Sequence, residues 1–216
     1  MNVTVIGAGN MGRGIGHRLV AGGNSVTLID TSAEAAETLA TELRGVAKQG
    51  AVVKTATLEN VALGDVVVLA VQYGANLELA KKLSSRLAGK IVVDIANPLN
   101  ATYDGLVTAP DTSSAEELAK VVPVGVQVVK AFNTTFAGTL VAGQVGGQKL
   151  DVFLAGDDEN AKQAVAKLVT DGGLVAVDTG ALHRARQLEA LGLLGITLQL
   201  KHNLGFTTGW KLTRNS

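Results

Sequence analysis

The chain has 216 residues, 47% hydrophobic and 18% charged, which is enough to form the core of one domain or of one domain with a small addition. Nineteen basic and nineteen acidic residues give a formal net charge of zero, with no run of Lys or Arg, so we expect neither nucleic-acid binding nor attachment to a membrane. The absence of cysteine excludes disulfides, thiolate catalysis and cysteine-ligated metal centres.

The first thirty residues have the layout of a dinucleotide-binding site. An apolar strand predicted over residues 2–6 leads into Gly-Ala-Gly-Asn-Met-Gly at residues 7–12, a helix over residues 10–21, and a second strand that ends at Asp30. In such sites the phosphates lie at the helix N-terminus, where free N–H groups and the positive end of the helix dipole favour an anion. We expect the following residues of this loop to contact the cofactor: Gly7, Gly9, Asn10, Met11 and Gly12.

Each glycine of this motif has its own physical role. Gly7 permits the tight turn, Gly9 lets backbone N–H groups approach a pyrophosphate, and Gly12 lets the helix and strand pack closely. The alternative is a glycine-rich turn without a ligand, because 26 of the 216 residues are glycine. The position of the motif between a strand and a helix favours the cofactor site.

The end of the second strand bears on the choice of nucleotide. Asp30 lies 18 residues after Gly12, where an acid accepts the ribose hydroxyls of NAD and repels the 2′-phosphate of NADP. Residues 31–43 contain no Lys or Arg, so the residues alone favour NAD(H). The alternative is NADP, because Thr31 and Ser32 are able to donate hydrogen bonds to a 2′-phosphate. Arg13 or Arg18 would contact this phosphate if its side chain turned toward it.

Strand and helix patterns alternate along the rest of the chain. The predicted strands cover residues 25–30, a short segment within 51–63, and residues 65–71, 90–95, 126–131, 150–155 and 174–177. One predicted helix is capped by Thr31 or Ser32 and extends to about residue 43, and a short one begins at Ser113 or Ser114. The other predicted helices cover residues 75–87, 159–170 and 181–200.

This alternation predicts an α/β fold with a doubly wound, mostly parallel sheet of the Rossmann type and a short C-terminal helical extension. We expect residues 1–180 to form the dinucleotide-binding domain. Residues 181–216 would complete an acceptor cleft, a dimer interface or both. The longest apolar stretch, residues 191–200, is too short to span a bilayer, and the first residues lack a secretory signal, so we expect a cytoplasmic protein.

Residues just after the strands are candidates for the nicotinamide half of the site, because ligands of open α/β sheets lie at the carboxyl ends of the strands. Asn97 and Asn133 are suited to bind the carboxamide or the ribose, although Asn in these places also caps turns. The candidate segments after the three strands are residues 71–73, 96–98 and 132–134, and within them we expect cofactor contacts from Val71, Gln72, Asn97, Pro98, Asn133 and Thr134.

No residue is assigned as a catalytic acid, base or metal ligand. Tyr73 and Tyr103 lack a Lys four residues later, and the chain is too short for a large helical substrate domain. The three histidines are too scattered to indicate a metal site; we expect His17 to face solvent, and His202 to cap the last helix or, as the alternative, to line the acceptor cleft. A leucine stripe at residues 188, 191, 194 and 198 has helical spacing and is typical of core, or of a homodimer surface.

The segment Val-Val-Lys-Ala-Phe-Asn-Thr at residues 128–134, together with residues 7–12, resembles the NADP-dependent oxidoreductases that use the deazaflavin coenzyme F420. It also resembles the related reductase domain of six-transmembrane metalloreductases. The likeness extends over nearly the whole chain, including residues 152–158, 177–182 and 209–212.

The resemblance implies a homodimer that transfers hydride between a nicotinamide nucleotide and a flavin-like ring in a cleft formed partly by C-terminal residues. The acceptor would be F420 or a free flavin, FMN or FAD. Family members carry a Ser/Thr-Arg pair for the 2′-phosphate where this chain has Asp30-Thr31, so the family favours NADPH and Asp30 favours NADH. Two alternatives are a non-catalytic module that senses NAD(P)(H), and a dimeric carbonyl or imine reductase.

Overall fold

The computed structural model describes residues 1–213, which form ten strands, seven α-helices and two 3-10 helices. The strands are β1 (Asn2–Ile6), β2 (Ser25–Ile29), β3 (Val53–Thr55), β4 (Val66–Leu69), β5 (Ile91–Asp94), β6 (Gln127–Lys130), β7 (Gln144–Val145), β8 (Gln148–Lys149), β9 (Asp151–Gly156) and β10 (Val175–Asp178). The helices are α1 (Asn10–Ala21), α2 (Ala33–Val46), α3 (Tyr73–Leu83), η1 (Ser84–Arg86), α4 (Ser114–Val121), α5 (Ala137–Ala142), α6 (Glu159–Asp171), η2 (Leu182–Arg184) and α7 (Ala185–His202).

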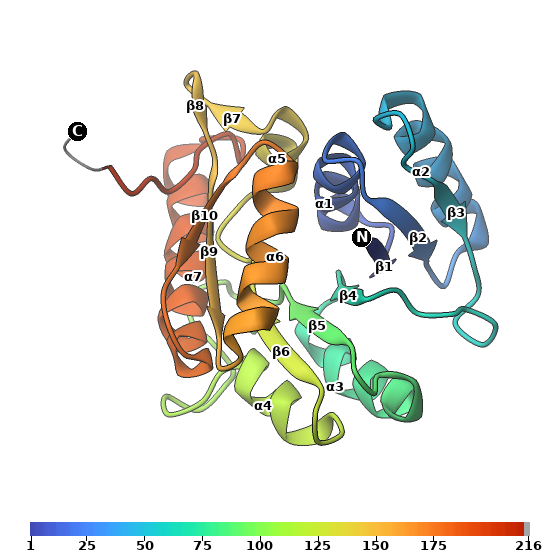
Figure 1. The fold of residues 1–216 in the computed structure, drawn as a ribbon. Coiled ribbons are helices and arrows are strands. Elements are labelled where there is room, and N and C mark those ends of the chain that lie inside the picture. The colour runs from blue at the N-terminus through green and yellow to red at the C-terminus, as the bar shows by residue number, and fades with distance from the viewer. Residues whose placement is uncertain (214–216) are drawn as a thin grey trace.

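Eight of these strands form one central sheet in the order β10-β9-β6-β5-β4-β1-β2-β3 (Figure 1). The strands from β3 to β6 are parallel to one another, β9 is antiparallel to β6, and β10 is parallel to β9. The six parallel strands have the order of a doubly wound fold, whose two halves meet between β1 and β4. The predicted α/β fold with a mostly parallel sheet is confirmed.

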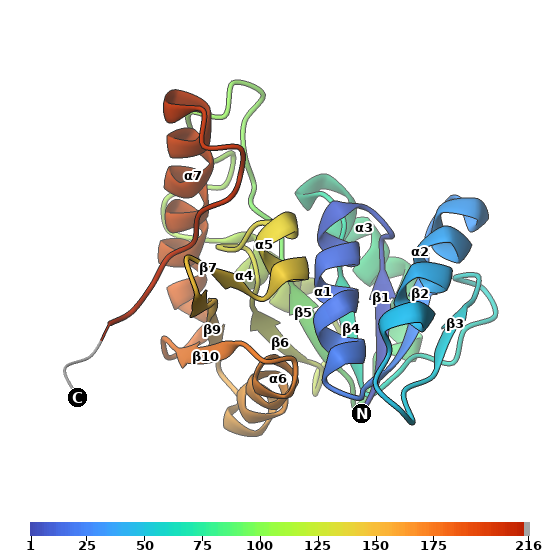
Figure 2. The ribbon, with the colours of Figure 1, turned by 90° about the horizontal axis from the view of Figure 1, so that it is seen from above.

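Helices cover both faces of this sheet (Figure 2). Residues of α1, α2, α5 and α6 pack into the hydrophobic core on one face, and residues of α3, α4 and η2 pack into the core on the other. All four residues of β4 are buried between these layers, as expected for a parallel strand covered on both sides. Helix α7 stands at the β10 end of the molecule, far from α2 and β3 (Figures 1 and 2).

Two elements escape the sequence prediction because they are too short to show a period. Helix α5 has six residues, two of which are Gly138 and Thr139, and the β7–β8 hairpin pairs strands of two residues each. The helix predicted over residues 75–87 begins earlier and is divided into α3 and η1. No helix among residues 1–213 is long and apolar enough to cross a bilayer.

His17 does not face solvent, so that prediction is wrong. The side chain is buried, and its Nε2 lies 2.6 Å from Glu42 Oε1 on α2. Helix α1 packs against α2, α5 and α6 as well as the sheet, so its side away from the strands is also covered.

The leucine stripe of α7 is not core along its length. Leu188 is buried, Leu191 and Leu198 are partly buried, and Leu194 is 48% exposed. Helix α7 ends at His202, and the residue that caps its C-terminus is Asn203, in the left-handed conformation. The division of the chain at residue 180 remains a proposal, and residues 214–216 lie outside the described part.

Candidate functional site

The glycine loop between β1 and α1 has a backbone that only glycine allows at two positions. Gly7 has φ +111°, and a Cβ there would lie 2.2 Å from the carbonyl oxygen of Ala70. A Cβ on Gly12 would lie 1.9 Å from the carbonyl oxygen of Gly7. The amide of Gly7 donates to Ile29 O at 2.8 Å, which holds the turn against β2. These contacts agree with the turn and close-packing roles predicted for Gly7 and Gly12.

Gly9 has a different environment, because no other group lies within 4 Å of the position of a Cβ on it. It caps α1 without a side-chain hydrogen bond, and the first turn of this helix contains no acid. Gly9, Asn10 and Met11 all line a cleft. The free N–H groups at the start of a twelve-residue helix therefore open toward a space that an anion can enter. This arrangement fits the pyrophosphate of a dinucleotide.

The cleft has a volume of about 620 Å³ and lies at the carboxyl ends of β1, β4 and β5, where the two halves of the sheet meet. Ligands of open α/β sheets bind at this place. The lining comes from the glycine loop, the ends of β4 and β5, the following loop and α7, and it comprises Gly9, Asn10, Met11, Ala70, Val71, Gln72, Tyr73, Gly74, Ile95, Ala96, Asn97, Leu99, Asn100, Ala101, Tyr103 and Ile196.

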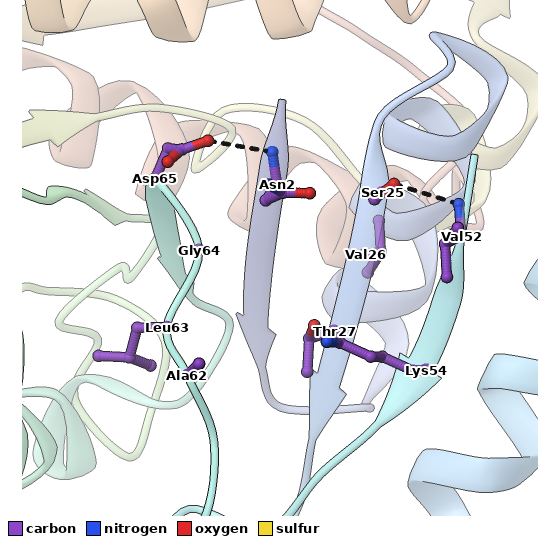
Figure 3. Close-up of a pocket in the computed structure, with 10 residues that line it drawn as sticks. All are labelled: Asn2, Ser25, Val26, Thr27, Val52, Lys54, Ala62, Leu63, Gly64 and Asp65. Atoms are coloured by element: carbon purple, nitrogen blue, oxygen red, sulfur yellow. Dashed lines mark hydrogen bonds between the residues drawn. The ribbon is translucent and has the colours of Figure 1, made fainter. Parts of the chain in front are cut away.

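A second cavity, of about 330 Å³, is lined by residues of β1, β2 and β3 and of the loop before β4 (Figure 3). Asn2 and Ser25 are the first residues of β1 and β2 there, and the loop before β4 forms another wall. Its lining residues come from strands and loops, so no helix N-terminus opens into it. We therefore place the candidate site in the larger cleft.

Asp30 directly follows β2 and contacts the glycine loop. Its Oδ2 accepts a hydrogen bond from the Ala8 amide at 2.7 Å, and its Oδ1 accepts from the Ser32 amide at 2.9 Å. Burial raises the pKa of Asp30, but these amides and the Thr31 hydroxyl lower it more, so the net pKa lies below its ordinary value. Asp30 is therefore ionised at neutral pH and puts a negative charge where the second strand ends.

The other groups considered for a 2′-phosphate are engaged. Ser32 caps α2, its Oγ accepting from the Ala35 amide at 3.1 Å, and the exposed Thr31 hydroxyl donates to Asp30 Oδ1 at 3.3 Å. Arg13 donates to both carboxylate oxygens of Glu42, at 2.8 and 2.9 Å. Arg18 donates to the carbonyl oxygen of Val141 at 2.7 Å, on the far side of α1. Neither arginine is directed at the end of β2.

Asn97 and Asn133 bind each other. Asn97 Nδ2 donates to Asn133 O at 2.8 Å, and Asn133 Nδ2 donates both to Asn97 Oδ1 at 2.9 Å and to Leu188 O at 2.8 Å. Helix α7 packs closely against this pair at Gly192. A Cβ on Gly192 would lie only 2.4 Å from Asn97 Oδ1. Asn97 is thus fixed at the cleft wall by its neighbour and by α7.

The six candidates after the strands do not all reach the cleft. Val71, Gln72 and Asn97 line it. Pro98, Asn133 and Thr134 are buried behind the wall. The oxygen atoms Asn133 Oδ1 and Thr134 Oγ1 are buried without a hydrogen-bond partner among residues 1–213.

Three fully buried charged side chains lie beneath the site. Lys130 Nζ donates to Asp94 Oδ2 at 2.9 Å, to Glu189 Oε1 at 2.7 Å and to Ala96 O at 2.5 Å. Asp94 Oδ1 also accepts from Asn76 Nδ2 at 2.6 Å, and Glu189 Oε2 accepts from the Ser114 amide at 3.2 Å. Burial raises the pKa of Glu189 more than Lys130 lowers it. This cluster joins β5, β6 and α7, directly below the residues that lead to Asn97.

Sequence reasoning placed Tyr73 and Ala96 in the segments after the strands, but it missed other residues that line the cleft. Tyr73 lines the cleft at the start of α3, and its hydroxyl donates to Glu117 Oε2 at 2.6 Å. This bond to Glu117 raises the pKa of Tyr73 to about 12. Tyr103 and Asn100 belong to a loop without periodicity, and Ile196 lies in a helix whose leucines suggested another face.

Comparisons with known proteins identify the family. A family model described as NADP oxidoreductase coenzyme F420-dependent matches residues 2–98. The F420-dependent NADP reductase of Methanocaldococcus jannaschii is 34% identical over 213 residues, covering 94% of each chain. The chain belongs to this family. Because its members are oxidoreductases, the predicted enzyme class is confirmed together with the family.

Two further proteins are similar to this chain. Metalloreductase STEAP3 of Rattus norvegicus is 32% identical over 191 residues, which cover 88% of this chain and 36% of that protein. The crystal structure of a putative F420-dependent NADP reductase from Arthrobacter sp. FB24 matches with a TM-score of 0.81 and 28% identity, over 98% of this chain and 99% of the other. At this coverage the agreement includes α7 as well as the sheet.

Proposed function

We propose that this chain transfers a hydride between a nicotinamide dinucleotide and coenzyme F420. The observation that carries the proposal is the N-terminus of α1. It has no side-chain cap, and it opens into the 620 Å³ cleft where the two halves of the sheet meet. The names of the relatives support NADP and F420 as the two redox partners.

The residues around the cleft suggest how the nucleotide lies. Its pyrophosphate would contact the backbone of the glycine loop, and the adenosine ribose would lie toward Asp30, Thr31 and Ser32. The nicotinamide would lie beside Asn97, whose amide is held by Asn133. Val71 and Gln72 would form the adjoining wall, with Pro98 and Thr134 holding it from behind.

The bound cofactors would supply the redox chemistry: NAD(P)H gives up a hydride, and F420 takes up this hydride and a proton. The protein then has to bring the two rings into contact and exclude water. The structure suits such a role, because the Tyr73 hydroxyl is bound to Glu117 and the Lys130 ammonium is fully buried. The amides at the cleft orient the nicotinamide, and no side chain is assigned as a proton donor.

The nucleotide preference depends on two opposing observations. The relatives are named for NADP, whereas the ionised Asp30 would repel a 2′-phosphate, and Arg13 and Arg18 are bound to other groups. We propose that Asp30 brings NADH into the range of usable donors, so that both nucleotides support turnover.

The test is a steady-state assay with purified protein. NADH or NADPH is mixed with oxidised F420, FMN or FAD, and the absorbance of the nucleotide and of the acceptor is followed together. We expect equal amounts of nucleotide oxidised and F420 reduced. Absence of turnover with all three acceptors and both nucleotides would refute the proposal.

The same assay separates the alternatives. Tight nucleotide binding without reduction of any acceptor would indicate a sensing module. Nucleotide oxidation with a carbonyl or imine but with no tricyclic acceptor would indicate a reductase of those groups. Turnover with FMN or FAD in place of F420 would identify a flavin reductase.

We also propose that the enzyme is a homodimer. The support is the apolar surface on the C-terminal half of α7, where Leu194 and Leu200 are 48% and 54% exposed. Light scattering of the protein as it elutes from a size-exclusion column gives its molar mass directly. A monomer at micromolar concentration would contradict this part of the proposal.

A further inference from the structure

Both tyrosines of the chain line the cleft, although aromatic residues are scarce at 3% of the sequence. They differ in what holds them. The Tyr73 hydroxyl is hydrogen-bonded to Glu117, whereas no hydrogen bond joins the Tyr103 hydroxyl to any of residues 1–213. Tyr103 is also 51% exposed. An exposed ring at the mouth of a cleft is available to a ligand.

The backbone of Tyr103 is in an unfavourable conformation. Its φ is +57°, in the left-handed region that a bulky side chain seldom adopts. Such strain persists only where the surrounding structure imposes it, and it occurs frequently at ligand sites. Asn or Gly at this position would form the same turn at lower cost.

Hydrogen bonds within the loop impose this conformation. Asn100 Nδ2 donates to Asp104 Oδ1 at 2.7 Å, and Asn100 Oδ1 accepts from the Asp104 amide at 3.1 Å. The Thr102 hydroxyl donates to the same Asp104 oxygen at 2.7 Å, and the Tyr103 amide donates to Asn100 O at 3.2 Å. The loop is closed at its base by a bridge between Leu99 and Leu106. Tyr103 is therefore presented by a preorganised turn.

The position of this turn indicates which ligand Tyr103 meets. Gly9, Asn10 and Met11 form the wall of the cleft that fits the pyrophosphate, and Asn97 and the turn line the same cleft. The turn itself shares the lining with Ile196 of α7, and Figure 2 shows residues 99–112, in light green, beside α7 and far from α2. A ring bound past the nicotinamide would lie against this part of the cleft.

We propose that Tyr103 stacks on the tricyclic ring of the hydride acceptor and that the turn at residues 99–106 forms the acceptor subsite. The assignment rests on the proposed function and deepens it. Aromatic side chains bind planar rings through their faces, so the ring of Tyr103 is needed and its hydroxyl is not.

The test compares two substitutions at this position. Tyr103→Phe keeps the ring, and Tyr103→Asn removes it while suiting the left-handed backbone. Binding of oxidised F420 is measured by quenching of its fluorescence, and binding of NADH and NADPH by calorimetry. We expect Tyr103→Asn to weaken F420 binding at least tenfold, and Tyr103→Phe to bind F420 within twofold of wild type.

Nucleotide binding and thermal stability give the controls. Both variants should bind the nucleotide within twofold of wild type, and Tyr103→Asn should unfold at the same temperature or higher, because its backbone strain is relieved. Val107→Ala changes a residue of the same loop that is 55% exposed but does not line the cleft, and should leave F420 binding unchanged.

Each other outcome has a distinct meaning. F420 binding by Tyr103→Asn that equals wild type would overturn the inference alone. Equal weakening of F420 and of the nucleotide would place Tyr103 in the nucleotide half and also overturn it. A wild-type protein that binds neither F420 nor FMN nor FAD would refute the proposed function, and the acceptor subsite with it.

Discussion

Replacing Lys130 by Met tests how much of the fold depends on the buried charge cluster. Lys130, Asp94 and Glu189 are all 0% exposed, and the ammonium lies within 2.9 Å of both carboxylates. Met keeps much of the volume but leaves two carboxylates facing each other without a cation. Loss of one partner of a buried ion pair costs about 3–5 kcal/mol, a large part of a total stability of roughly 5–15 kcal/mol.

The assay is chemical unfolding of the variants, followed by circular dichroism. The matched control is Lys167→Met, because Lys167 pairs with Asp171 on the exposed side of α6, with 66% of its side chain accessible. That pair should contribute less than about 1 kcal/mol. A loss below about 1 kcal/mol for Lys130→Met, equal to that of the control, would refute the reasoning.

Glu189 adds a pH dependence to the same experiment. Its pKa is raised in the folded protein, mainly by burial, so the folded state holds a proton more firmly than the unfolded state. A carboxyl with a raised pKa lowers stability as the pH rises through the interval between the unfolded and folded pKa values. Removing Lys130 raises this pKa further, so the loss should be larger at about pH 8 than at about pH 5. Adding Glu189→Gln to Lys130→Met should restore part of the stability at the higher pH.

Three further changes probe the cleft. Asp30→Ser with Thr31→Arg should shift preference toward NADPH by about 1 kcal/mol or more, about fivefold, in the ratio of kcat/KM values; an unchanged ratio would show that Asp30 does not face the ribose. Gly9→Asp should raise the nucleotide Kd at least about tenfold, whereas Gly45→Asp, at an equally open position in α2, should not. Gly192→Ala should lower kcat with intact folding, because its Cβ displaces an amide of the cleft wall; unchanged turnover would remove α7 from the positioning of that amide.

The nucleotide half of the site was predictable because its signals are local. The turn at Gly7, the close approach at Gly12 and the open backbone at Gly9 lie within six residues, between a strand and a helix whose patterns are clear. Ser32 was one of two predicted caps of α2, and its side chain makes that bond. Propensity and spacing are sufficient where all the partners are close in sequence.

The acceptor half could not be predicted in the same way. Tyr103 becomes notable only through its positive φ and its place in the cleft, and neither is visible in a loop without periodicity. The partners of Lys130 lie 36 and 59 residues away in the sequence. Within residues 128–134, Lys130 looked like part of a family motif, and the structure shows a fully buried ammonium whose role is packing α7 against the sheet.

Helix α7 shows why hydrophobicity was a poor guide to its orientation. Its buried residues are Ala185, Leu188, Glu189, Gly192, Gly195 and Gln199, a stripe at spacings of three and four that contains a carboxylate, an amide and two glycines. Within this stripe Glu189 binds Lys130, and Gly192 lies against the Asn97 amide. Ile196, next to Gly195 in the sequence, lines the cleft. The other leucines of the predicted stripe, at residues 191, 194 and 198, lie on a different and partly or fully exposed side. A helix that completes a polar site buries the residues that the site needs, so its functional face is found from its partners across the cleft and not from its most apolar stripe.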